Sequence, residues 1–98
     1  MSLMEIALRT GVTVEDVESL VRGNASAGIA NRLGVPLLGL DEFLKHGYAS
    51  AALAHRMGTS MAGAEELARE VGREGTVGIV LGLLLGASVG ERWKQRGV

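Results

Sequence analysis

The chain contains no cysteine, only one proline and only three aromatic residues. Without cysteine it can form no disulfide, no thiolate metal site and no cysteine nucleophile. The lack of cysteine also fits a reducing compartment, and the N-terminal residues have no basic stretch before an apolar run, as a secretory signal requires. These absences predict a cytoplasmic protein with an aliphatic core.

The chain also lacks a large excess of charge of either sign, because ten basic and eleven acidic residues leave a net charge of −1. Such a balance predicts no general attraction to nucleic acid or to anionic membranes. The length of 98 residues corresponds to one domain, residues 1–98, and an apolar content of 47% is sufficient for a core.

Residue patterns that would indicate catalysis or metal binding are absent from the sequence. No carboxylate completes a zinc-binding spacing with the two histidines, His46 and His55. The serines have no evident base partner, and adjacent carboxylates such as Asp41-Glu42 point to different sides of a helix. We therefore expect no catalytic, cofactor-binding or metal-binding residues, and no enzymatic activity.

The sequence does contain a seven-residue pattern that occurs three times, at residues 6–12, 29–35 and 53–59. Repetition every 23 to 24 residues indicates one supersecondary unit used three times. We place the repeats at residues 4–23, 27–47 and 50–72. Each has apolar residues at helical spacing and one apolar face that it cannot bury alone, so the three units must pack on a common surface.

Each repeat predicts a short helix, a tight turn and a second helix. The turns fall at Gly11, Gly34 and Gly58, since glycine readily adopts the positive φ that ends a helix. Thr13 and Asp16 predict a capping box at the next helix. The other expected caps are Asn24 or Ser26, Ser50, and Thr59 or Ser60, and the second helices are expected to end at Gly23, Gly47 and Gly72.

Charged residues repeat as well. Acidic residues precede basic ones by four positions in the pairs Glu18–Arg22, Asp41–Lys45 and Glu65–Arg69. This order favours ion pairs on a helix surface, so the pairs form either a solvated face or a ladder that recognises a charged partner. A second ladder, Arg9, Arg32 and Arg56, could hold acidic side chains of a neighbouring repeat or point toward an anion.

The repeat resembles the helix-turn-helix of phage-repressor-type DNA-binding domains. That family has an apolar residue and an alanine before the glycine turn, then apolar residues six and nine positions after it. The first copy matches throughout, with Ile6, Ala7, Gly11, Val17 and Leu20. The later copies keep the alanine, the glycine and both later apolar positions, so the resemblance covers about 20 residues at a time in three tandem copies.

The resemblance implies that the second helix of each unit would enter the major groove of DNA. Those helices are acidic here, and residues 4–72 hold six basic against nine acidic residues, a net −3. Since DNA affinity comes largely from phosphate neutralisation, a DNA-binding transcriptional regulator is the alternative and not the main prediction. Its contacts would come from the second helices or from residues 73–98, which carry a net +2.

Residues 76–89 form an uncharged run, and glycines recur at every fourth position in it and directly after it: Gly78, Gly82, Gly86 and Gly90. We predict an apolar, glycine-striped helix over residues 75–96. Each glycine costs such a helix about 1 kcal/mol relative to alanine, so a regular stripe indicates close approach of another helix, as in a glycine zipper. Because the rest of the run is apolar, the helix is expected to be buried all round.

Three environments can bury this helix: the core of the domain, a second copy of the chain, or a membrane. The run from residue 76 to 90 spans about 22 Å, less than the roughly 30 Å of a bilayer core. A basic, aromatic segment follows it and is a candidate for polar contacts or interfacial anchoring: Arg92, Trp93, Lys94 and Arg96.

The sequence therefore predicts an all-α domain of three tandem helix-turn-helix-like hairpins packed with one C-terminal apolar helix. The predicted function is a non-catalytic interaction or assembly module that associates with itself, or with another protein, through the four glycines. A DNA-binding regulator is the alternative, and a membrane-inserted or tail-anchored protein is the third possibility.

Overall fold

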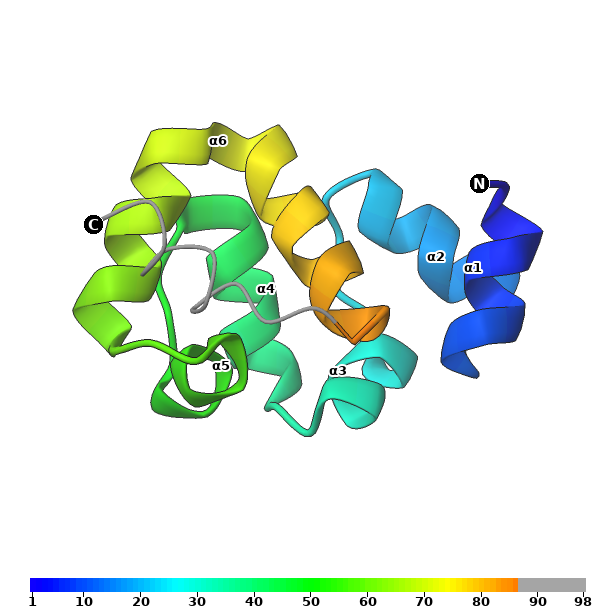
Figure 1. The fold of residues 1–98 in the computed structure, drawn as a ribbon, viewed down its shortest axis with the longest axis horizontal. Helices are drawn as coiled ribbons and strands as arrows, with labels where there is room; N and C mark the ends of the chain where they lie inside the picture. Colours follow the sequence, from blue (N-terminus) through cyan, green and yellow to red (C-terminus); the bar gives the residue numbers. More distant parts are fainter. Residues whose placement is uncertain (87–98) are drawn as a thin grey trace.

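A computed structural model of the chain describes residues 1–86, and within that range every regular element is a helix (Figure 1). The helices are α1 (Leu3–Thr10), α2 (Val14–Val21), α3 (Ala27–Leu33), α4 (Leu37–His46), α5 (Ala51–Met57) and α6 (Met61–Leu84). The predicted all-α class is confirmed. Of the predicted contact residues, Gly90, Arg92, Trp93, Lys94 and Arg96 lie outside the described range.

The predicted glycine bends are present at all three positions. Gly11, Gly34 and Gly58 end α1, α3 and α5 in the left-handed conformation, with φ of 80°, 72° and 83°. A side chain at these positions would collide with the following carbonyl group, which is why glycine is found there. The bends therefore follow directly from the repeated pattern.

Side-chain caps begin most of the helices. Thr13 and Asp16 form the predicted capping box of α2, each side chain accepting a hydrogen bond from the backbone N–H of the other. Between the alternatives that the sequence left open, Ser26 and Ser60 are the caps of α3 and α6, and Ser50 caps α5. These bonds satisfy first-turn amides that have no partner within the helix.

The C-terminal part of the chain agrees with the prediction at Gly72 and differs from it at Gly86. The φ of 73° and ψ of −176° at Gly72 are non-helical, so α6 consists of two helical segments joined by a bend, where the sequence places the end of the third repeat. The helix predicted over 75–96 ends at Leu84, where Gly86 takes a φ of 91° and donates its N–H to the carbonyl of Leu83. Gly86 thus follows the helix and is not part of its stripe.

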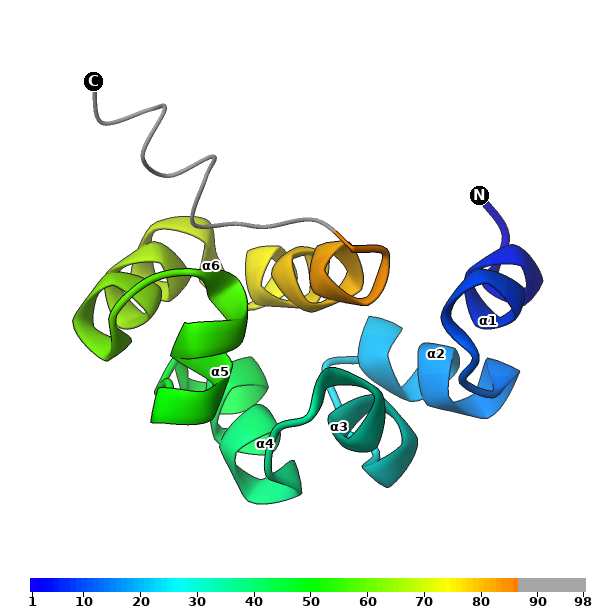
Figure 2. The ribbon, with the colours of Figure 1, turned by 60° about the horizontal axis from the view of Figure 1, so that its bottom comes forward.

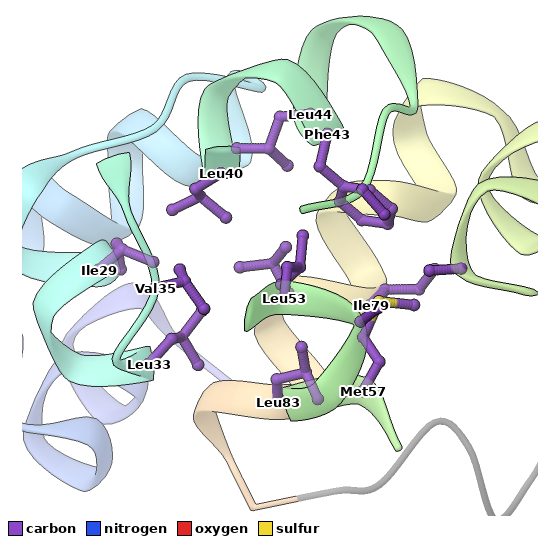
Figure 3. Packing of buried hydrophobic residues seen from close by; sticks show 14 of the residues in the cluster. Ile29, Leu33, Val35, Leu40, Phe43, Leu44, Leu53, Met57, Ile79 and Leu83 are labelled. Carbon is purple, nitrogen blue, oxygen red and sulfur yellow. The ribbon is translucent and has the colours of Figure 1, made fainter. Parts of the chain in front are cut away.

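The C-terminal half of α6, residues 73–84, supplies the common surface that the apolar faces of the repeats require. α6 contacts α2, α3, α4 and α5, and Figure 2 shows its C-terminal half above α3 and α4. Ile79 and Leu83 enter one core with Leu40, Phe43 and Leu53, as Figure 3 shows. A smaller cluster lies between α1 and α2, where Leu81 packs against the side chains of Ile6, Ala7 and Val17.

Candidate interaction surface

The glycines of the stripe that lie within α6 are on the side of the helix that faces away from the core. Gly78 is exposed, and a Cβ atom placed on it would meet no atom within 4 Å. Gly82 is half-buried, whereas Ile79, Val80 and Leu83 face inward. The expectation that this helix is buried all round is therefore wrong.

Helical geometry explains the arrangement. Residues two positions apart lie on roughly opposite sides of an α-helix, so Gly78 and Gly82 both lie opposite Val80. Burial of Val80, which is fully inaccessible, fixes the helix rotation and turns both glycines outward. Leu85, which is 42% exposed, follows on the same side. We call Gly78, Gly82 and Leu85 the glycine face.

Packing within the chain does explain why another residue of α6 is a glycine. A Cβ atom on Gly75 would overlap the side chain of Val71, which lies one turn earlier, across the bend at Gly72. The bend therefore excludes larger residues at position 75. Among the described residues no comparable contact exists at Gly78, so packing within residues 1–86 accounts for Gly75 but not for Gly78.

The predicted acidic–basic pairs form in two repeats and not in the third. Glu18 and Arg22 approach to 4.0 Å, and Asp41 and Lys45 to 3.1 Å. In the third repeat Oε2 of Glu65 instead accepts a 3.0 Å hydrogen bond from the backbone N–H of Ala49. Glu65 thus holds the segment between α4 and α5, and the expected pair with Arg69 is not formed.

One arginine of the predicted ladder, Arg32, makes a hydrogen bond within the chain. Nε of Arg32, on α3, donates a 2.6 Å hydrogen bond to the carbonyl oxygen of Thr10 at the end of α1. The last carbonyl groups of a helix lack intrahelical partners and favour a positive charge. Arg32 therefore joins the second repeat to the bend of the first through a backbone group, and not through an acidic side chain.

Asp16 connects α2 to α3. Partial burial opposes ionisation of its carboxyl, but hydrogen bonds from the Thr13 N–H and from the hydroxyls of Ser26 and Thr13 outweigh it and hold the pKa of Asp16 below its usual value. A Cβ atom on Gly28 would overlap the same carboxylate. The carboxylate thus occupies space next to α3 that only a glycine at position 28 leaves open.

Sequence reasoning missed two exposed apolar sites. Met4 and Leu8 lie one turn apart on the outer side of α1, 59% and 77% exposed, and Leu38 at the start of α4 is 71% exposed. The signal for the first was available, because Ile6 and Ala7 belong to the repeated pattern and face the core. In a helix of that geometry, residues 4 and 8 must then face outward.

Within residues 1–86 there is no group of three or more side chains that could hold a metal ion, and no helix is both long and apolar enough to cross a membrane. His46 and His55 are both exposed. Comparison with known proteins gave no match: no family model, no curated protein and no solved structure is detectably similar to this chain.

Proposed function

We propose that this protein is a non-catalytic assembly module that associates with a second copy of itself through the glycine face. The observation that carries the proposal is the open space at Gly78. A glycine inside a helix costs about 1 kcal/mol relative to alanine. Since nothing among residues 1–86 requires a glycine there, contact with another helix would explain it.

The chemistry of the glycine face suits helix–helix contact. At Gly78 the helix presents bare backbone, so a partner helix can approach closely there and gain dispersion contacts. Leu85 adds exposed apolar surface next to this path. Two copies related by a two-fold axis would bring identical faces together, which is the commonest geometry of homodimers. The stripe continues in the sequence at Gly90, beyond the described residues.

The test is the oligomer mass of Gly78→Leu, measured by sedimentation against concentration. Because Gly78 faces open space, the leucine variant should fold, yet its side chain would separate the two helices and lower the association constant at least tenfold. Ala62→Leu places the same side chain on an exposed site in the first half of α6 and should leave association unchanged.

Gly78→Ala provides a second test. Alanine should raise the free energy of unfolding of the dissociated chain by about 1 kcal/mol. A gain in stability with weaker association supports the proposal. If the wild-type chain is monomeric at all accessible concentrations, or if Gly78→Leu and Ala62→Leu have the same mass, the glycine face is not an assembly surface.

A DNA-binding regulator stays the second candidate. It is favoured by the first repeat, where the Gly11 bend and the Thr13 cap give the tight corner between α1 and α2 that the helix-turn-helix requires. It is opposed by exposed carboxylates on second helices, Glu15 on α2 and Glu66 and Glu70 on α6. The third possibility, a membrane-inserted helix, involves residues 76–90 and so extends beyond the described range.

A mobility-shift titration with duplex DNA at low salt separates the first two functions. The assembly proposal expects no saturable binding below about 1 µM, since acidic second helices cannot neutralise phosphates. Saturable binding in that range that weakens steeply as salt is added would instead favour the regulator.

A further inference from the structure

A cavity that is separate from the glycine face lies where the end of α4 meets the bend of α6. Its volume is about 180 Å³, enough for a small chemical group. Four of the residues that line it are basic, and none of its described lining residues is acidic: Lys45, His46, Arg69 and Arg73. We call this the elbow cavity.

The two arginines at the elbow cavity have no acidic partner among residues 1–86. Ion pairs in that range join Glu18 to Arg22 and Asp41 to Lys45. Glu65, which the repeat places one turn before Arg69, binds the N–H of Ala49 instead. The charge pairing of the repeats is thus broken in the one copy where a basic cavity lies beside the arginine.

The surroundings favour a compact anion with several oxygen atoms. Arg69 and Arg73 lie on the two sides of the Gly72 bend, and a guanidinium group binds phosphate oxygens with two parallel hydrogen bonds. The lining also includes Phe43 and Leu44, which are almost completely buried and form an apolar floor. A charge held against such a floor is less screened than one in bulk water.

Backbone groups at the bend support the same charge preference. After Gly72, whose ψ is extended, the helix begins a new first turn, and first-turn amides lack intrahelical acceptors and favour negative charge. Lys45 contributes less than the arginines, because it is already paired with Asp41 at 3.1 Å. His46, at the end of α4, also lines the cavity.

We propose that the elbow cavity is a binding site for a phosphate group, carried either by inorganic phosphate or by a small phosphomonoester. Arg69 and Arg73 bind the phosphate oxygens, and the apolar floor limits the ligand to a group of phosphate size. A dianion is favoured over a carboxylate because two arginines without an acidic partner among residues 1–86 line one cavity. This site does not depend on self-association.

The test is a titration of the full chain with inorganic phosphate at constant ionic strength, followed by amide chemical shifts. Saturable shifts are expected at residues around the cavity, including Gly47, Gly72 and Arg73. Arg69→Gln and Arg73→Gln should each weaken the Kd about tenfold or more, the usual size for a lost charge-assisted hydrogen bond. Both arginines are exposed, so folding should be unaffected, and circular dichroism checks this.

Arg56→Gln is the matched control, because it removes the same charge from an exposed arginine of α5 that does not line the cavity. Its phosphate affinity should equal that of the wild type. A parallel titration with glycerol phosphate distinguishes the two sources: tighter binding of the monoester indicates contacts beyond the phosphate, and equal binding indicates recognition of the phosphate group alone.

The proposal is overturned if chloride at the same ionic strength produces the same shifts, or if phosphate produces no saturable shift up to about 10 mM. It is also overturned if Arg69→Gln and Arg73→Gln bind phosphate within twofold of Arg56→Gln. Shifts at these residues that occur only with duplex DNA would likewise reject a small-phosphate site.

Discussion

At the scale of single residues, polar side chains act mainly on the backbone of other segments. Arg32 reaches the carbonyl of Thr10, and Glu65 reaches the N–H of Ala49. The sequence indicated that these residues were charged members of a ladder, but their partners lie 22 and 16 positions away. Local spacing predicts interactions within a helix and carries no information about such distant acceptors.

Asp16 gives a prediction about acid stability. Its pKa is lowered in the folded chain from an ordinary value of 3.8, so its contribution to the free energy of unfolding is complete above that value and is lost as the pH falls through the lower folded value. Asp16→Asn should therefore reduce stability at pH 7 by about 0.5–1 kcal/mol, with a smaller difference near pH 3.

Urea unfolding at both pH values measures this effect. Glu15→Gln, an exposed neighbour in the first turn of α2, is the control and should show little change. An equal loss for Asp16→Asn at pH 7 and near pH 3 would show that the ionised carboxylate is not the stabilising form.

At the scale of the elements, the two sides of α6 have different environments. Its inward side contributes Ile79, Val80 and Leu83 to the core, and its outward side carries Gly78 and Gly82. The sequence placed Gly78 and Gly82 on one side of a helix, but the spacing alone did not say which side of the helix faces the core. Burying the larger side chains removes more apolar area from water, and this decides the orientation.

Leu83→Ala should test how much the inward side of α6 contributes to the free energy of unfolding. Leu83 is fully buried, so truncation should lower the free energy of unfolding by about 2–5 kcal/mol. Leu38→Ala, at a site that is 71% exposed, should change it by no more than about 0.5 kcal/mol. Thermal or urea unfolding of both variants makes the comparison, and similar values would mean that α6 is not integral to the core.

At the scale of the whole molecule, local features were predictable and the assembled arrangement was only partly so. The all-α class, the bends at Gly11, Gly34 and Gly58 and the capping box at Thr13 follow from propensities that act over a few residues. The packing of α6 on four other helices and the elbow cavity depend on contacts between segments far apart in the chain. Neither has a signature within one repeat.

The position of the C-terminal half of α6 also has a consequence for biosynthesis. This segment is made after all three repeats, yet Ile79, Val80, Leu83 and Leu84 belong to the core that those repeats share. While a ribosome is still translating residues 73–84, the emerging repeats have apolar faces with nothing to cover them. Folding to the native state must then wait for the last part of α6, and the unfinished chain is the form most exposed to aggregation or to capture by a chaperone.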